Sequence, residues 1–296
     1  MIVTVLGAEG FVGKNLFEDL SKHFSTVGSA RKNESSTYPK NVFFFDLLKP
    51  DAWNELVSIQ PDVIINCIGY GVVKAQTDVK QMVDINYLQT VKLYEYIGRS
   101  LPLTYLVHIG TAFEYDLQVN QLTEQSNCTP LTYYGLSKYL TSNYLLQSGV
   151  VKSFSIIRPF NMFGPYENLS KIIPTLITAQ RLKSPVPLSE GLQKRDYLFV
   201  KDLSGLIEKL INNPASRLPV INAGSGRLFA LRELAEQLAV HIKGFDANLW
   251  EWGKLPYREG ESPSFFSSSR VAADCGMLLT DYNKAFDITV NYYWNV

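Results

Sequence analysis

The stretch that decides the fold is IVTVLGAEGFVG, residues 2–13. Its first five residues are apolar or β-branched and predict a buried strand. Gly7, Gly10 and Gly13 follow directly, and apolar residues then recur at helical spacing at positions 12, 16, 20 and 24. We therefore predict a strand, a glycine turn and a helix, a unit that turns a helix N-terminus toward an anionic phosphate.

Each glycine of this turn has its own expected role. Gly7 permits the tight turn, Gly10 lets the backbone approach a pyrophosphate closely, and Gly13 allows close packing of helix on strand. The glycines are spaced three and three, not two and three as in the general dinucleotide fingerprint. The turn predicts a dinucleotide site, and the alternative is an ordinary connection between strand and helix.

A second motif, YGLSK at residues 134–138, gives the turn a chemical meaning. On a helix, Tyr134 and Lys138 lie on one face because they are four residues apart. A nearby cation favours the phenolate, so we expect the pKa of Tyr134 to lie below its ordinary value of about 10. A tuned Tyr beside a dinucleotide site predicts proton transfer coupled to hydride transfer on a C–OH/C=O pair. Taken alone, the spacing also fits a solvated helix face.

With these two motifs, the chain resembles the extended short-chain dehydrogenase/reductase family, specifically its NAD(P)-dependent nucleotide-sugar epimerases, dehydratases and reductases. The resemblance covers nearly the whole chain and implies an α/β fold, a Rossmann-type doubly wound parallel sheet with a smaller C-terminal substrate-binding lobe. Five further segments match the family in order: DINY at 84–87, HIGTAFEY at 108–115, RPFNMFGP at 158–165, RDYLFVKD at 195–202 and LPYREG at 255–260.

The alternation of apolar runs supports the same architecture. Strand-like runs at 2–6, 26–30, 42–45, 62–68, 103–109 and 154–158 alternate with helical patterns near 11–23, 51–59, 79–99 and 133–148. This order predicts a parallel sheet covered by helices on both faces. Further amphipathic helices are expected at 172–182, 203–211 and 231–242. The resemblance implies that residues 1–163 with about 196–224 form the NADP-binding Rossmann domain, and that 164–195 and 225–296 form the substrate-binding lobe.

The resemblance also implies roles for individual residues. The catalytic set is Thr111, Tyr134 and Lys138, and Asn86 matches the family's structural Asn. The expected cofactor contacts are Gly7, Gly10, Phe11, Val12, Gly13, Ser29, Arg31, Asp46, Leu47, Cys67, Ile68, Gly69, Asn86, Tyr134, Lys138 and Pro159. The expected substrate contacts are Thr111, Asn161, Arg195 and Arg258, the two arginines as diphosphate clamps. Surface salt bridges are the alternative for both arginines, and a helix cap is the alternative for Thr111.

The end of the second strand bears on the cofactor. An acid about 20 residues past the glycines selects NAD by binding its ribose 2′-OH, but the sequence here is Ser29-Ala30-Arg31-Lys32, with Arg31 at the family's position for that acid. Arg31 can grip a 2′-phosphate in planar geometry. We therefore expect NADP(H), with NAD less favoured, and a solvated basic loop is the alternative.

Composition excludes several classes of protein. The net charge is zero with 28 basic and 28 acidic residues, which gives no reason to expect nucleic acid or membrane as a partner. Cys67, Cys128 and Cys275 have no metal-ligand spacing and, with a chain that begins directly in a strand, indicate a cytoplasmic protein without a metal. His23, His108 and His241 are expected to be structural. The family resemblance implies a homodimer.

We predict a reductase that uses NADPH on the keto group of a nucleotide-linked 4-keto-6-deoxysugar, as in deoxysugar and surface-polysaccharide biosynthesis. One alternative is a nucleotide-sugar epimerase that retains its NAD(P), and another is a non-catalytic NADP-binding regulator on the same fold. Family dehydratases place an Asp-Glu pair directly after the catalytic Thr. Here Ala112 and Phe113 occupy those positions and Glu114 comes one step late, which argues against a dehydratase.

Overall fold

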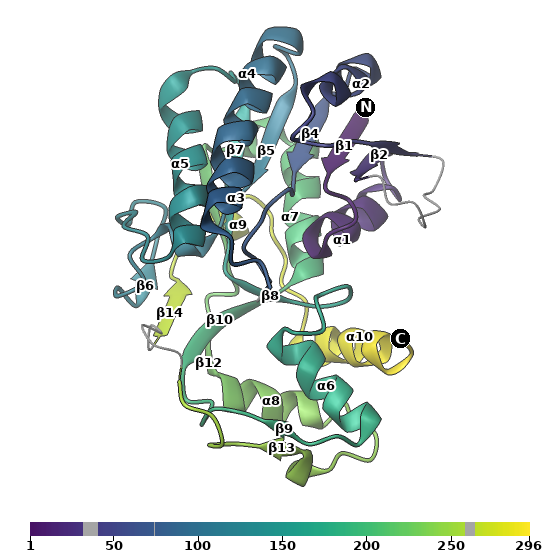
Figure 1. Cartoon of the computed structure of the whole chain (residues 1–296), viewed down its shortest axis with the longest axis vertical. Coiled ribbons are helices and arrows are strands. Elements are labelled where there is room, and N and C mark those ends of the chain that lie inside the picture. The colour runs from purple at the N-terminus through teal and green to yellow at the C-terminus, as the bar shows by residue number, and fades with distance from the viewer. Residues whose placement is uncertain (32–40, 74, 258–263) are drawn as a thin grey trace.

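The computed structural model of the 296-residue chain describes residues 1–31, 41–73, 75–257 and 264–296. Its centre is a seven-stranded sheet in the order β11-β7-β5-β4-β1-β2-β3, in which every neighbouring pair is parallel (Figure 1). The strands of this sheet are β1 (Ile2–Leu6), β2 (Ser25–Ala30), β3 (Val42–Phe44), β4 (Val63–Asn66), β5 (Tyr105–Ile109), β7 (Phe154–Pro159) and β11 (Val220–Ala223). The predicted doubly wound α/β fold is confirmed.

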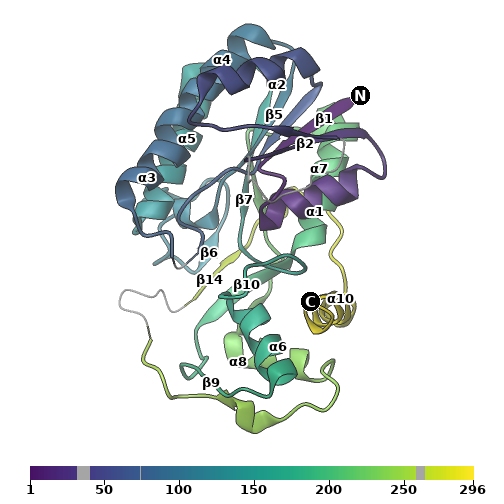
Figure 2. The same cartoon turned by 45° about the vertical axis from the view of Figure 1, so that its right-hand side comes forward.

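Helices cover both faces of this sheet (Figures 1 and 2). One face carries α1 (Phe11–Leu20), α7 (Val200–Asn212) and α9 (Val271–Asp274). The other carries α2 (Trp53–Ile59), α4 (Thr90–Ser100) and α5 (Tyr133–Ser148). Short elements lie between them: η1 (Pro50–Ala52), α3 (Val79–Val83), the π-helix η2 (Asp84–Gln89), η3 (Ala112–Glu114) and η4 (Pro214–Ser216). Each face is sealed by its own buried apolar cluster.

The remaining elements form a smaller part below the sheet in Figure 1. Its strands are β6 (Gln121–Leu122), β8 (Asn161–Phe163), β10 (Lys194–Phe199), β12 (Leu228–Ala230) and β14 (Ser264–Ser267), with a separate pair of β9 (Val186–Pro187) and β13 (Trp250–Glu251). Its helices are α6 (Ile172–Leu182), α8 (Leu231–Ala239), η5 (Ala247–Leu249) and α10 (Tyr282–Trp294). A third cluster of buried side chains joins α6, α8 and α10.

The sequence predicted many element bounds well because local signals mark them. The helices at 133–148 and 172–182 begin and end where predicted. Thr132 caps the first of these, since its hydroxyl accepts a hydrogen bond from the Gly135 N–H at 3.0 Å. Gly149, in the left-handed region at φ 65°, ends the same helix. The helix α10 was not predicted.

The chain crosses between its two parts several times. After β10, α7 packs on α1, and β11 becomes an edge strand of the seven-stranded sheet. The sequence assigned all of 225–296 to the substrate lobe, but this is wrong for one segment. Ala272, Cys275 and Met277 are buried in the core under the sheet, because α9 packs against β11.

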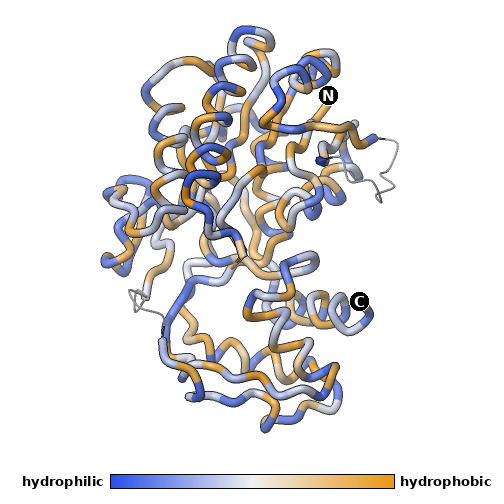
Figure 3. The backbone as a smooth tube through the Cα atoms, in the orientation of Figure 1, coloured by the Kyte–Doolittle hydropathy of each residue, from blue (hydrophilic) through white to orange (hydrophobic). Residues whose placement is uncertain are grey.

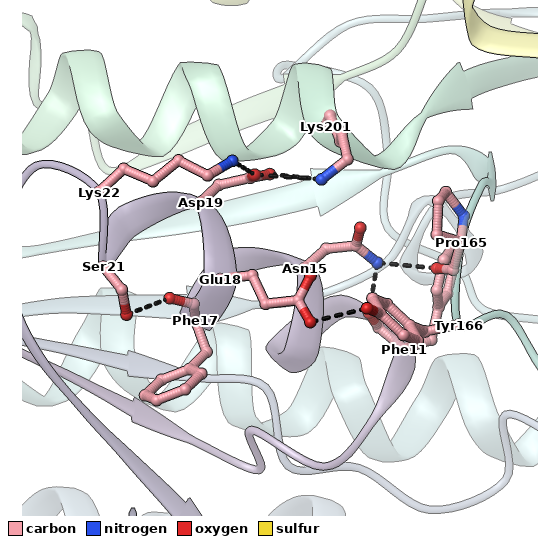
Figure 4. Close-up of polar contacts among 10 residues, drawn as sticks. All are labelled: Phe11, Asn15, Phe17, Glu18, Asp19, Ser21, Lys22, Pro165, Tyr166 and Lys201. Carbon is pink, nitrogen blue, oxygen red and sulfur yellow. Dashed lines mark hydrogen bonds and ion pairs between the residues drawn. The ribbon is translucent and has the colours of Figure 1, made fainter. Parts of the chain in front are cut away.

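The helix α1 is tied to the segment that follows β8 (Figure 4). Asn15 donates from Nδ2 to the carbonyls of Phe11 and Pro165, each at 2.9 Å. Tyr166 donates from its hydroxyl to Glu18 at 2.7 Å. Tyr166 has a φ of 69°, a left-handed backbone that costs a non-glycine residue about 1–2 kcal/mol. These contacts hold a strained turn against the helix of the glycine motif.

The same helix is also paired with α7. Asp19 accepts from Lys201 at 3.0 Å and from Lys22 at 2.7 Å, and Figure 4 shows the carboxylate between the two ammonium groups. These two cations lower the pKa of Asp19, although burial opposes them. The pairing joins the first helix of the sequence to one that begins about 180 residues later.

Hydropathy follows the layers of the fold. In Figure 3 the central strands are mostly hydrophobic, whereas the helices alternate hydrophobic and hydrophilic turns, as expected for elements with one buried face. Among the described helices, none is both long and apolar enough to span a bilayer.

Candidate active site

The glycine turn has the geometry of a phosphate cradle. Gly7 has a φ of 77°, which favours glycine, and the Gly10 N–H donates to the Gly7 carbonyl at 3.1 Å. A Cβ at Gly13 would lie 2.1 Å from the Gly7 carbonyl oxygen, so only glycine lets α1 begin so close to β1. Gly10 caps α1 without a side chain, and the first turn holds no acid. Phe11 and Val12 follow at this open, positively polarised helix end, which fits the pyrophosphate of a dinucleotide.

The end of β2 lies beside this cradle, and its Ser29 binds the glycine turn itself. Ser29 is 1% exposed, and its hydroxyl accepts from the Gly7 N–H at 3.1 Å. Ser29 therefore supports the glycine turn from below, where we had expected a cofactor contact. Its burial follows from its place in an interior strand of the sheet.

Arg31 lies on the surface next to the same turn. Its side chain is 77% exposed, and its Nε donates to the Glu9 carboxylate at 3.2 Å. Glu9 belongs to the glycine turn itself, and the sequence gave no reason to connect it with Arg31. The cation predicted to hold a 2′-phosphate is thus paired with an acid in the cradle.

The other expected cofactor contacts lie near the ends of β3 and β4. Asp46 follows β3 and accepts from the Leu48 N–H at 3.0 Å, while Leu47 is buried in the core. Cys67 donates from its N–H to the Leu6 carbonyl at 3.0 Å, and Ile68 lies against Gly7. Gly69 continues this loop beside Asn86. Cys67 to Gly69 and the glycine turn therefore lie side by side.

Asn86 joins three segments of the site from inside the π-helix η2. Its side chain accepts from the Tyr70 N–H and donates to the Tyr70 carbonyl, both at 2.8 Å. It also donates to the Ser137 hydroxyl at 2.9 Å, and its carbonyl accepts from Thr141 at 2.6 Å. Asn86 is 1% exposed and fastens the loop after β4 to α5. The structural role that the family resemblance implies for Asn86 agrees with this geometry.

Thr111, Tyr134 and Lys138 converge at the carboxyl end of β5. Thr111 follows β5 and is 6% exposed, and α5 carries a half-buried Tyr134 and a Lys138 that is 3% exposed. A Cβ at Gly135 would lie 2.1 Å from the Phe113 carbonyl oxygen, so glycine lets α5 come this close to η3. Thr111 also caps η3, since its hydroxyl accepts from the Phe113 N–H at 3.3 Å. The expected cap and the expected catalytic position coincide in this residue.

The pKa of Tyr134 is opposite to our prediction. Burial of the phenol raises its pKa to about 12, while a side-chain hydrogen bond with Thr111 acts in the other direction and the Glu114 charge raises it further. Burial also lowers the pKa of Lys138 to about 8, opposed by the charges of Glu114 and Cys67. The predicted lowering of the pKa of Tyr134 is therefore wrong, because desolvation of the phenol outweighs the hydrogen bond with Thr111.

His108 lies below this set and has no free acid–base role. Its Nδ1 is 2.6 Å from the hydroxyl of Tyr94, which also accepts from Asn66 at 2.8 Å. Complete burial holds the pKa of His108 well below its usual range, and the charges of Lys138 and Arg158 lower it further. The ring is therefore neutral, which agrees with a structural role.

The substrate side is built around Arg195. This residue is 8% exposed on β10, and its guanidinium lies 4.9 Å from the ring centre of Phe265. Phe265 in turn contacts Phe113 at 5.8 Å, and Phe113 contacts Tyr134 at 6.3 Å between ring centres. Arg195 is therefore connected through two rings to the phenol of Tyr134, the expected proton donor. Neither Phe113 nor Phe265 was expected from the sequence.

Two further residues were expected on this side. Asn161 begins β8 and donates to the carbonyl of Asp196 at 3.4 Å, directly after Pro159 has ended β7. Arg258 lies outside the described residues. Asp196, next to Arg195, is fully buried and accepts from Ser225, Gly226 and Ser267 at 2.6–3.1 Å. It thereby fastens the loop after β11 and strand β14 to β10.

The comparison with known families gives this geometry its context. Residues 3–224 match the model of the NAD-dependent epimerase/dehydratase family. The chain belongs to that family. The match spans the glycine turn, the catalytic set and the return of the chain to the sheet.

Solved structures share the family fold over the full chain. A UDP-glucuronic acid 4-epimerase from Bacillus cereus, in complex with UDP-glucuronic acid and NAD, is 21% identical with a TM-score of 0.86 and covers 100% of this chain and 99% of its own. A UDP-glucose 4-epimerase from Thermotoga maritima with UDP-glucose is 17% identical, with a TM-score of 0.85 and coverage of 100% and 99%. A dTDP-glucose 4,6-dehydratase from Bacillus anthracis in complex with NAD is 19% identical, with a TM-score of 0.81 and coverage of 100% and 97%.

Glu114 has contacts in the site that the sequence analysis does not predict. The sequence identifies it only as an acid that comes one step too late for the dehydratase Asp-Glu pair. In the structure it is fully buried, its Oε1 accepts from the Thr111 N–H at 2.9 Å, and its Oε2 accepts from Arg158 Nε at 2.9 Å. The Thr-x-x-Glu spacing at 111–114 is a capping-box pattern and could have predicted the first contact.

Proposed function

We propose that this family member is a reductase that uses NADPH to reduce the keto group of a nucleotide-linked 4-keto-6-deoxysugar. The observation that carries the proposal is the end of β2, where Arg31 follows Ala30 and no carboxylate is present to bind the ribose 2′-OH of NAD. A reductase consumes its cofactor in every cycle and must exchange it with a cellular pool, for which NADPH is the usual donor, whereas an epimerase regenerates its own NAD. Tyr134, whose pKa burial raises to about 12, can donate the proton that reduction of a ketone requires.

The chain's own residues divide the reaction as follows. The nicotinamide supplies a hydride when bound. Thr111, fixed at the end of β5, would offer its hydroxyl to the substrate oxygen, and Tyr134 would donate its phenolic proton to that oxygen. Lys138 stands one helical turn further along α5 and stabilises the phenolate until solvent returns the proton. The product is an alcohol, and one proton and one hydride are consumed.

The glycine cradle and the loop at 67–69 would hold the dinucleotide, and Arg31 would hold its 2′-phosphate. No carboxylate ends β2, which removes the usual selection for NAD. The proposed cofactor part comprises residues 1–163 and about 196–224, and we include 271–277 in it because Ala272, Cys275 and Met277 are buried under the same sheet. The substrate part is the remainder, with Arg195 and Asn161 facing the nucleotide sugar.

Stoichiometry tests this proposal directly. The purified protein is mixed with NADPH and a panel of 4-keto-6-deoxy nucleotide sugars carrying UDP, dTDP, CDP or GDP. We expect one NADPH to be oxidised for each alcohol formed with one of these. Interconversion of sugars with no net change in cofactor absorbance would reject the reductase.

A nucleotide-sugar epimerase with retained NAD is the second candidate, and one observation favours it. The Glu9 carboxylate beside Arg31 places a negative charge where a 2′-phosphate would lie. If the protein purifies with bound NAD and converts one nucleotide sugar into its epimer, this candidate replaces the first.

A further inference from the structure

A buried ion pair lies directly behind the catalytic set. The side chains of Glu114 and Arg158 are 0% and 3% exposed, and Oε2 of the acid is 2.9 Å from Nε of the arginine. Burying two charges is costly and is tolerated only where both are well paired.

The other carboxylate oxygen of Glu114, Oε1, binds the backbone of Thr111. Oε1 accepts from the Thr111 N–H at 2.9 Å, while the Thr111 hydroxyl accepts from the Phe113 N–H. Gly110 makes room for this arrangement, because a Cβ there would lie 2.4 Å from Oε1. The orientation of the Thr111 backbone therefore depends on the carboxylate.

Arg158 in turn is fixed to the sheet. It lies on β7, in register with Asn222 of β11. Its guanidinium is 4.5 Å from the ring centre of Tyr115, and the Tyr115 hydroxyl donates to Asn222 at 2.8 Å. The acid is thus anchored through one oxygen to the seven-stranded sheet and through the other to the catalytic residue.

We propose that Glu114 is a positioning residue for the catalytic set: one carboxylate oxygen fixes Thr111, the other is held on the sheet by Arg158, and the carboxylate is the counter-charge of the buried Lys138. The catalytic meaning of this role rests on the proposed function. The contacts and the charge of Glu114 do not depend on that function.

The charges that face Lys138 support this role. Burial lowers the pKa of Lys138, and Glu114 on η3 contributes the larger of the two opposing charges, with Cys67 after β4 as the smaller. His108 on β5 is neutral, and Tyr134 on α5 is protonated. Among the described side chains packed around Lys138, the carboxylate of Glu114 is therefore the anion that remains at neutral pH.

The test measures Lys138 itself. The cofactor-free protein, labelled with ¹³C-lysine, is titrated by NMR, and the Lys138 signal is assigned with Lys138→Arg. We expect a midpoint near pH 8 in the wild type, and a shift downward by about one unit in Glu114→Gln, because an opposite charge nearby is lost. Glu114→Gln leaves Arg158 buried and unpaired. If this variant does not fold, the double variant Glu114→Gln/Arg158→Met is compared with Arg158→Met, because these two differ only in the charge of residue 114, and the double variant should have the lower Lys138 midpoint.

Two further variants separate charge from position. Glu114→Asp keeps the charge but is too short to hold both Thr111 and Arg158, so we expect the Lys138 midpoint to stay while kcat falls about 10-fold. Glu233→Gln is the matched control, since Glu233 is also the acid of a capping box and accepts the Ala230 N–H at 2.8 Å at the start of α8. It should leave the Lys138 midpoint unchanged.

Equal Lys138 midpoints in the wild type and Glu114→Gln, or in Arg158→Met and the double variant, would overturn the electrostatic role, and full kcat in Glu114→Asp would overturn the positioning role. If the wild type turns over no nucleotide sugar, the proposed function fails, but the titration still decides whether Glu114 acts on Lys138.

Discussion

The catalytic corner and the ribose end of the site are built in opposite ways. Thr111 and Lys138 are 6% and 3% exposed, and buried partners on several elements surround them. Arg31 is 77% exposed and pairs with the partly exposed Glu9. A change in the corner disturbs the packing of β5 and α5, whereas a change at the ribose end alters only surface charge. Under the proposed function, the expected catalytic residues are therefore tied to the fold, whereas the proposed choice of cofactor depends on the surface pair of Arg31 and Glu9.

The largest effect on kcat is expected in the buried corner, when Tyr134 loses its phenolic proton. Tyr134→Phe keeps the ring that packs on Phe113 but cannot donate a proton, so kcat should fall about 10²- to 10⁴-fold. Cofactor affinity, measured by fluorescence titration, should stay close to that of the wild type. Wild-type turnover in this variant would make the motif structural and favour a regulatory protein.

The burial of Lys138 should also affect how the free energy of unfolding depends on pH. The pKa of Lys138 is about 8 in the folded protein and 10.5 in the unfolded chain, so between these values the unfolded chain binds more protons. The free energy of unfolding contributed by this group therefore rises with pH across that window, by about 3 kcal/mol in total. Urea unfolding of the wild type and Lys138→Met from pH 7.5 to 10.5 measures the difference. The exposed Lys152→Met is the matched control, and parallel curves for wild type and Lys138→Met would contradict the expectation.

The substrate side lies between these extremes, because Arg195 is buried but faces the catalytic phenol through two rings. Arg195→Met keeps much of the packing on Phe265 and removes the charge. Calorimetry should show nucleotide-sugar affinity about 10- to 100-fold weaker, with NADPH affinity less affected. The exposed Arg232→Met serves as control. If Arg195→Met binds a nucleoside diphosphate as tightly as the wild type does, Arg195 does not hold the diphosphate.

The smallest effects are expected at the ribose end. Arg31→Ala should weaken NADPH binding about 10-fold and leave NADH binding unchanged, since one exposed charge-assisted contact is lost. Glu9→Gln should strengthen NADPH binding, because it removes the acid that competes with the 2′-phosphate. If the wild type binds NADH more tightly than NADPH, the proposed preference for NADPH is wrong.

The sequence predicted what local patterns encode. The strand at 2–6, the glycine turn after it and the helices at 133–148 and 172–182 follow from short-range signals, whereas the expected catalytic set follows from the family resemblance. The sequence could not predict the pairing of Arg31 with Glu9, because that contact joins residues 22 positions apart on the surface. The raised pKa of Tyr134 was missed for another reason: spacing shows which charges are near, but only the folded structure shows how much water is lost.

β11 and α9 follow the substrate segments in the sequence but belong to the seven-stranded sheet and its covering helices. This limits where segments can be exchanged between this protein and its relatives. Because β11 pairs with β7 and α9 packs on β11, a C-terminal exchange at residue 164 would remove an edge strand and expose the backbone hydrogen-bonding groups of β7. A chimaera that borrows another relative's sugar specificity therefore needs paired crossovers on both sides of α7 and β11. By the same reasoning, a protease cut between residues 165 and 171 should leave two fragments that copurify.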